Sequence, residues 1–213
     1  MSHDQHIVVA AGVGPAALGA LPADAYVIAA DGGLERCGSL GLRPDLVVGD
    51  LDSVPGEALA AAERDGVEVV RHPARKDATD LELALDEALA RGASRVLVVA
   101  SAEGRLDHLL ASLLLLGSPR YRGVELDALV GDARVHVIRD ERALAGVPGA
   151  TVTLLAVGGP AAGVHTEGLE YPLSGETLEP GSSRGVSNTL TAPTARITVT
   201  DGVLLAVLPG ADG

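Results

Sequence analysis

The feature that most constrains the fold is the alternation of short aliphatic runs with helix-like segments in the first half of the chain. Each run is rich in Val, Ile or Ala and closes on Gly, Asp, Pro or Ser. Apolar strands separated by helices are typical of a parallel sheet that is covered by helices on both faces. We therefore expect strands within 6–12, 26–33, 45–53, 67–73 and 95–101, and helices within 32–41, 55–66, 79–92 and 107–117.

From about residue 124 the pattern changes to strands with little helical periodicity, separated by Gly, Pro and Asp turns. This pattern indicates an antiparallel sandwich or barrel. The fold class that we expect is α/β, with a Rossmann-like parallel-sheet domain over residues 1–125 and a smaller all-β domain over residues 135–213. The boundary should lie between 118 and 140. The later strands are expected within 124–131, 134–140, 150–159, 163–173, 194–202 and 203–210.

The charge balance limits the possible ligands, because 16 basic residues face 29 acidic ones and the net charge is −13. A nucleic-acid partner is not expected, since it needs a basic face. An anionic substrate would need a cation or a local basic group. The lone Cys37 fits a reducing compartment. No apolar run approaches the roughly 20 residues of a membrane span, and no signal peptide is recognisable, so we expect a cytoplasmic protein.

Polar residues follow four consecutive predicted strands, and in an open parallel sheet ligands bind beyond the carboxyl ends of the strands. We expect these residues to meet on one rim of the sheet. In chain order they are Asp31, Gly32 and Gly33; then Asp50 and Asp52; then Arg75, Lys76, Asp77 and Asp80; and finally Glu103, Gly104, Arg105, Asp107 and His108.

The pair Asp50 and Asp52 predicts a cation site. Alternate side chains of an extended chain leave the same face, so the two carboxylates should repel each other. Mg²⁺ prefers one or two carboxylates together with waters and substrate phosphates. The alternative is a strand-end turn whose solvated acids cap the helix that begins near Pro55.

The segment around Thr79 allows a structural and a functional interpretation. Thr79 and Glu82 fit a capping box, and Asp80 suits the first turn of a helix. Neither explains Lys76 and Asp77. A lysine beside a helix N-terminus is suited to bind phosphate.

The residues after the fifth predicted strand favour a functional interpretation. Arg105 is suited to bidentate contact with phosphate oxygens. Asp107 and His108 open a helix that is too apolar to be exposed. His108 is equally open to a role as a ligand-binding residue and as a capping or core histidine.

These motifs, read in order as ADGG, GDLDS, KDATDLELAL and EGRLDH, resemble those of the thiamine pyrophosphokinase family. The later segment GLEYPLSGETLEPGSSRGVSN resembles the β domain of the same family. The resemblance implies transfer of pyrophosphate from ATP to the hydroxyl of thiamine, giving thiamine diphosphate and AMP. It also implies dependence on Mg²⁺ and a homodimer through the β domain, with thiamine bound at the dimer interface.

The resemblance also implies roles for single residues, by position in the motifs. Mg²⁺ would be held by Asp50, Asp52 and Asp80. The nucleotide would be bound by Asp31, Gly32, Lys76, Asp77, Thr79, Arg105 and His108. The catalytic residues would be Asp80, Arg105 and Asp107, and either Asp107 or Asp80 would orient the attacking hydroxyl. Ser187 and Asn188 would line the thiamine pocket, where Tyr171 is the one aromatic residue that the β domain offers.

Three other functions remain open at this stage. One is a pyrophosphokinase for another hydroxymethyl compound, such as a pterin. Another is a haloacid dehalogenase-like phosphatase with Asp50 as nucleophile, although its motif would follow the third strand rather than open the fold. The third is a non-catalytic sensor of a magnesium-bound nucleotide.

Overall fold

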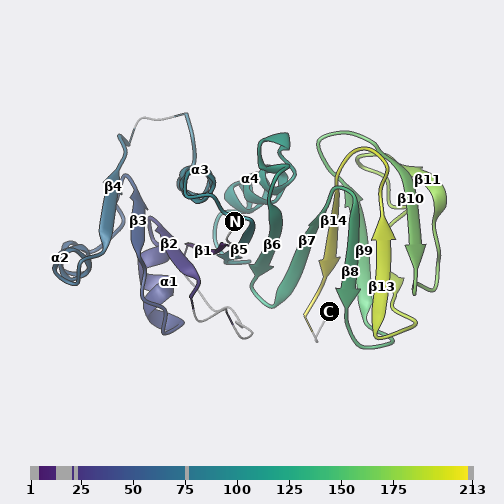
Figure 1. Cartoon of the computed structure of the whole chain (residues 1–213), viewed down its shortest axis with the longest axis horizontal. Helices are drawn as coiled ribbons and strands as arrows, with labels where there is room; N and C mark the ends of the chain where they lie inside the picture. The colour runs from purple at the N-terminus through teal and green to yellow at the C-terminus, as the bar shows by residue number, and fades with distance from the viewer. Residues whose placement is uncertain (1–4, 13–20, 22–23, 75–76, 211–213) are drawn as a thin grey trace. The chain divides into compact units, whose positions relative to one another are not determined.

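The chain forms two compact units, which extend over residues 1–112 with 123–131 and over residues 113–122 with 132–213. The computed structural model describes residues 5–12, 21, 24–74 and 77–210. The helices and strands carry the labels of Figure 1.

The first unit contains a parallel sheet with the strand order β6-β5-β1-β2-β3-β4. Helices follow the strands, as the alternating sequence pattern predicts. Helix α4 begins in this unit and ends in the second, where a short 3₁₀ helix follows it. The elements are β1 (His6–Ala11), β2 (Tyr26–Ala30), α1 (Gly33–Ser39), β3 (Leu46–Gly49), α2 (Gly56–Arg64), β4 (Glu68–Arg71), α3 (Asp80–Ala90), β5 (Arg95–Ala100), α4 (Leu106–Leu116), η1 (Pro119–Tyr121) and β6 (Glu125–Val130).

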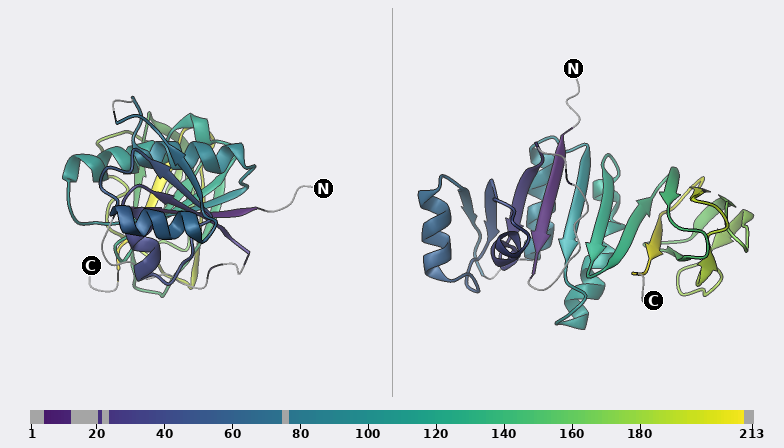
Figure 2. Two further views of the ribbon diagram at one scale, coloured as in Figure 1. Left: turned by 90° about the vertical axis from the view of Figure 1, so that its left-hand side faces the viewer. Right: turned by 90° about the horizontal axis from the view of Figure 1, so that it is seen from below.

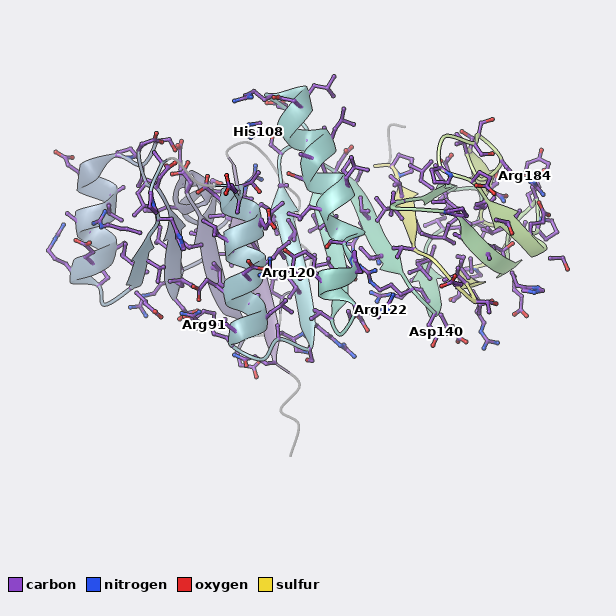
Figure 3. All side chains as sticks on the ribbon, turned by 90° about the horizontal axis from the view of Figure 1, so that it is seen from above. Arg91, His108, Arg120, Arg122, Asp140 and Arg184 are labelled. Carbon is purple, nitrogen blue, oxygen red and sulfur yellow. The ribbon has the colours of Figure 1, made fainter. Side chains whose placement is uncertain are left out.

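The central strands of this sheet are buried on both faces, which explains their continuous apolar sequences. Val8, Val27 and Val47 pack with Cys37 of α1 in one buried cluster. On the opposite face α3 contacts β1, β2 and β3. Helix α1 lies on the face seen in the right-hand view of Figure 2, and α3 lies on the face seen in Figure 3.

Glycine at position 33 allows α1 to approach β1 closely. A Cβ atom added to Gly33 would lie 1.9 Å from the carbonyl oxygen of Ala10, which is far inside van der Waals contact. No other residue type fits at this position without moving the helix away from the sheet.

The second unit is a sandwich of two antiparallel sheets, with the strand orders β12-β9-β14-β7 and β11-β10-β13-β8. Leu154, Val164, Ile197 and Leu204 come from both sheets and belong to one buried aliphatic cluster. Its strands are β7 (Ala133–Ile138), β8 (Glu141–Ala145), β9 (Thr151–Ala156), β10 (Ala161–Glu167), β11 (Ser174–Leu178), β12 (Asn188–Thr189), β13 (Thr194–Thr198) and β14 (Leu204–Leu208).

The α/β fold class is confirmed, with two corrections in detail. The strand predicted within 124–131 was grouped with the antiparallel part, but β6 pairs in parallel with β5. Strands β8, β11 and β12 were not predicted. They alternate charged or small residues with few β-branched ones, so their sequences lack the aliphatic signal.

Helix α4 differs from its prediction as a buried helix. Leu106, Leu110 and Leu114 are 67%, 52% and 62% exposed, and their spacing of four residues places them along one side of the helix. Apolar character alone therefore did not identify the environment of this helix. Among the described residues, no helix is both long and apolar enough to cross a membrane.

Candidate active site

Four acidic residues from three segments of the first unit meet at one place. Carboxylate oxygens of Asp31, Asp50 and Asp52 all lie within 4.8 Å of one another. Asp31 follows β2, and the other two follow β3. A Cβ atom added to Gly49 would lie 2.9 Å from Oδ1 of Asp80 and 3.2 Å from Cβ of Asp31, so Asp80 at the start of α3 lies at the same spot. We call Asp31, Asp50, Asp52 and Asp80 the acidic cluster.

The backbone around Leu51 differs from the extended conformation that was expected. Leu51 has a φ of +62°, in the left-handed region, and its side chain is buried. The backbone N–H of Asp52 donates to Oδ1 of Asp50 at 3.3 Å. The two carboxylates are therefore brought together by a turn around a buried leucine. The predicted proximity and repulsion of the two acids are confirmed, whereas the predicted extended backbone is wrong.

The electrostatics of the acidic cluster favour a cation. Repulsion by Asp50 raises the pKa of the Asp52 carboxyl, and the charges of Asp31 and Asp80 act in the same direction. Oδ2 of Asp31 accepts a hydrogen bond from Oγ of Ser53 at 2.5 Å. Oδ1 of Asp31 is buried and has no hydrogen-bond partner among the described residues.

A buried carboxylate oxygen without a partner is costly unless a cation or a donor satisfies it. Several carboxylate oxygens gathered in this way are the ligands that Mg²⁺ prefers. The residues present therefore fit a divalent cation. Ser53 belongs to the GDLDS motif, and its contact with Asp31 was not predicted because it depends on the fold.

The segment before α3 is only partly described. Lys76 lies outside the described residues, and Asp77 is exposed. Oγ1 of Thr79 accepts a hydrogen bond from the backbone N–H of Glu82 at 3.2 Å, which confirms the predicted N-cap. This cap fixes the first turn of α3 and with it the position of Asp80. Nucleotide binding by Lys76, Asp77 and Thr79 stays a prediction.

Helix α1 contains a buried arginine that the sequence analysis did not single out. Gly32 is the residue before the helix, and Arg36 on its buried side is only 1% exposed. The Nε of Arg36 donates to the carbonyl oxygen of Gly12 at 2.9 Å, at the carboxyl end of β1. Burial lowers the pKa of Arg36. The sequence GGLERCGSLG predicts a helix at this position, but it does not indicate that Arg36 is buried.

Arg105 and Asp107 form an ion pair in the loop after β5 and the first turn of α4. Nε and Nη2 of Arg105 donate to the two carboxylate oxygens of Asp107 at 3.2 and 2.6 Å. This hydrogen bonding lowers the pKa of Asp107 to about 2 and raises that of Arg105. His108 is exposed in the same turn (Figure 3). Because β2, β3 and β5 are parallel, this loop lies at the same edge of the sheet as the acidic cluster.

The second unit presents an aromatic side chain beside the residues that were expected to contact a substrate. Tyr171 is 57% exposed, and Asn188 is 5% exposed. The carboxamide of Asn188 bonds to the backbone of Tyr171. Ser187 is exposed, has a φ of +56° and donates its backbone N–H to Oγ1 of Thr153 at 3.0 Å. The structure thus brings Tyr171 and Asn188 together, with Ser187 next to Asn188 in the chain. Substrate contact by Ser187 and Asn188 stays a prediction.

Comparison with known families divides the chain into an N-terminal and a C-terminal part, in the order expected from the sequence. Residues 20–127 match the model of the thiamin pyrophosphokinase catalytic domain, and residues 134–204 match that of the thiamin pyrophosphokinase vitamin B1 binding domain. The chain belongs to the thiamin pyrophosphokinase family. The resemblance seen in the sequence motifs is confirmed.

Individual relatives agree with this membership. A protein named thiamine pyrophosphokinase 1 from Oryza sativa subsp. japonica is 26% identical over 73% of this chain, and the match spans 62% of its own length. A crystal structure of thiamine pyrophosphokinase from Bacillus subtilis has a TM-score of 0.83 at 22% identity, covering 97% of this chain and 99% of that one. A thiamin pyrophosphokinase family protein from Enterococcus faecalis has a TM-score of 0.81 at 25% identity, covering 96% and 98%.

Proposed function

We propose that the protein transfers a pyrophosphoryl group from ATP to the hydroxyl of thiamine in a Mg²⁺-dependent reaction that yields thiamine diphosphate and AMP. The observation that carries this proposal is the acidic cluster around Gly49. It lies in the unit that matches the family's catalytic domain. A site built of carboxylates suits a nucleotide that arrives with its metal ion, and a chain of net charge −13 would otherwise repel ATP.

In this proposal the acidic cluster holds Mg²⁺ through Asp50, Asp52 and Asp80, and the buried free oxygen adds Asp31 to the set. The ion, when bound, neutralises the negative charge of the phosphate oxygens. Ser53 holds the carboxylate of Asp31 in place through its hydrogen bond. Phosphoryl transfer depends mainly on positioning and charge neutralisation, and the cluster would supply both through the ion that it holds.

Basic side chains bind the phosphates in the same proposal. Arg105 is suited to contact two phosphate oxygens at once. Lys76, His108 and the backbone near Gly32 would make further contacts with the phosphates. Asp77 and Thr79 would belong to the same nucleotide site. On binding phosphate, Arg105 releases Asp107. The pKa of Asp107 then rises from about 2 toward its ordinary value.

A released Asp107 is the better of the two candidates to orient the attacking hydroxyl. Asp80 adjoins the acidic cluster, where the metal would occupy its oxygens. The carboxylate oxygens of Asp107 do not bind the metal, and they are free of Arg105 once Arg105 has moved to the phosphates. We therefore assign Asp107 to accept the hydrogen bond of the thiamine hydroxyl and Asp80 to the metal.

The second unit supplies thiamine recognition in this proposal. Tyr171 offers an exposed ring to the cationic thiazolium, with which an aromatic face interacts favourably. Ser187, which precedes Asn188 in the chain and has a left-handed conformation, is exposed and offers its hydroxyl. We further propose a cytoplasmic homodimer that forms through this unit, where Val147, Leu155 and Val186 remain exposed.

The proposal is tested by incubating the protein with ATP, Mg²⁺ and thiamine and measuring AMP and thiamine diphosphate. Wild type should form both in equal amounts, and Asp52→Asn should form almost none while it stays folded. Asp24→Asn, which removes the same charge from an exposed acid elsewhere, is the matched control and should react as wild type. AMP formed only with a pterin or another hydroxymethyl compound would change the substrate, and a phospho-aspartate trapped on Asp50 would replace the proposal with a phosphatase.

A further inference from the structure

The carboxamide of Asn188 is almost fully used by the protein itself. Its Oδ1 accepts hydrogen bonds from the backbone N–H groups of Tyr171 at 3.0 Å and of Thr189 at 2.9 Å. Its Nδ2 donates to the carbonyl oxygen of Tyr171 at 2.7 Å. The side chain is only 5% exposed. An amide oxygen that already accepts two bonds has no capacity left for a ligand.

These bonds hold the backbone of Tyr171 through both its N–H group and its carbonyl oxygen. The segment between β10 and β11 also joins β12 through the backbone N–H of Glu170, which donates to the carbonyl oxygen of Thr189 at 2.9 Å, and through a bridge between Leu169 and Leu190. Pro172 follows directly and restricts the conformation of the residue before it. The backbone is therefore held in place while Tyr171 as a residue stays 57% exposed.

We infer that Asn188 is a positioning residue, which fixes the backbone of Tyr171 at the place from which its ring receives the cationic ring of the substrate. This inference rests on the proposed function, because it assigns Tyr171 to thiamine. A backbone segment that is fixed before binding loses less conformational entropy on binding, so the affinity depends on the anchor of Tyr171 as well as on its ring. Asn188 itself does not touch the substrate.

Thr166 provides a matched control for a purely structural role. It is also buried, at 6% exposure, and its Oγ1 accepts a hydrogen bond from the backbone N–H of Leu173 at 2.8 Å. The same leucine is also held by backbone pairing with Thr166. Thr166→Val thus removes a buried side chain–backbone bond two residues from Tyr171 and leaves the tyrosine anchor intact.

The test is a double-mutant cycle on the full chain, with the dissociation constant of thiamine measured by calorimetry. Tyr171→Ala should raise this constant roughly tenfold, and Asn188→Ala should raise it by a similar or smaller factor. The double variant should bind no more weakly than Tyr171→Ala alone, because Asn188 acts only through the ring. Thr166→Val should lower the melting temperature with unchanged thiamine affinity. The affinity for Mg-ATP should stay unchanged in all variants.

A second measurement needs no ligand and is made by NMR hydrogen exchange. The amide proton of Tyr171 should exchange slowly in wild type and faster in Asn188→Ala, while that of Leu173 stays slow. Should Asn188→Ala fail to fold, Asn188→Leu, which keeps the volume without the hydrogen bonds, takes its place in both experiments.

The outcomes separate the inference from the proposed function. Wild type that does not bind thiamine overturns the proposed function. Wild type that binds, with an Asn188 variant of equal affinity, overturns the positioning role and leaves the function standing. Additive losses in the double variant overturn it as well, since they show that Asn188 acts independently of the ring of Tyr171. An unchanged exchange rate at Tyr171 shows that the anchor does not hold the segment.

Discussion

Gly49 has no Cβ atom, and this leaves the space in which Asp31 and Asp80 approach each other. A methyl group there would lie 2.9 Å from Oδ1 of Asp80. The φ of Gly49 is +149°, which side chains rarely adopt. The acidic cluster thus depends on a residue that carries no charge.

Gly49→Ala should therefore disperse the cluster and weaken the binding of divalent cations. The strained backbone should also lower the free energy of unfolding by on the order of 1–3 kcal/mol. Calorimetric titration with Mg²⁺ in the presence of ATP and urea denaturation measure the two effects. Gly38→Ala, in open space on α1, should be slightly more stable than wild type and bind the ion normally. Normal metal binding by Gly49→Ala would contradict the packing described here.

The ion pair of Arg105 and Asp107 predicts a pH dependence. The folded chain holds the proton of Asp107 less tightly than an isolated carboxyl does, since the pKa is lowered to about 2. The pair is therefore complete above the ordinary pKa of an aspartate and is lost as the pH falls toward 2. An NMR titration of Asp107 should show a midpoint near 2 in wild type and a higher one in Arg105→Gln. Equal midpoints would show that the pair does not form in solution.

Sequence reasoning expected the acidic residues on one rim of the sheet because they belong to motifs at strand ends, and the structure brings four of them together. It identified Asp50, Asp52 and Asp80 as neighbours. It missed the contact of Ser53 with Asp31 and the burial of Arg36, because both depend on loops and helices from different parts of the chain. Composition and periodicity do not predict which residues that are distant in sequence come into contact in the fold.

At the scale of elements, the N-terminus of helix α3 affects both the stability of the helix and the acidic cluster, because its first residue is Asp80. Thr79→Ala removes the hydrogen bond of the N-cap and should lower the free energy of unfolding by about 1 kcal/mol. Urea denaturation measures this loss, and Thr79→Ser, which keeps the hydroxyl, should lose much less. Equal losses for the two variants would show that the hydroxyl does not cap the helix.

The strands that were predicted correctly are those with an unbroken aliphatic signal, such as β1 and β5. β8 and β11 alternate exposed with less exposed positions and contain charged residues, so local sequence did not distinguish them from loops. The turn at Leu51 was missed for another reason. A left-handed leucine is unfavourable by itself, and burial of its side chain in the core compensates for it.

At the scale of the whole molecule, exposed apolar residues predict self-association. Sedimentation should give wild type twice the chain mass of 21.4 kDa. Val147→Asp, at a position that is 72% exposed in the second unit, should shift the protein toward the monomer. Leu110→Asp on α4 should leave the dimer intact. A dimer that is disrupted only by the change at Leu110 would place the interface on α4 instead of on the β unit, and a wild-type monomer would contradict the dimer.

The central claim is that the acidic cluster binds a divalent ion together with the nucleotide. Electron paramagnetic resonance of Mn²⁺, with a non-hydrolysable ATP analogue, tests this claim most directly. Wild type and Asp24→Asn should hold the ion in a protein-bound state, and Asp52→Asn should leave it in the spectrum of the free nucleotide complex. A bound signal in Asp52→Asn equal to that of wild type would contradict the account.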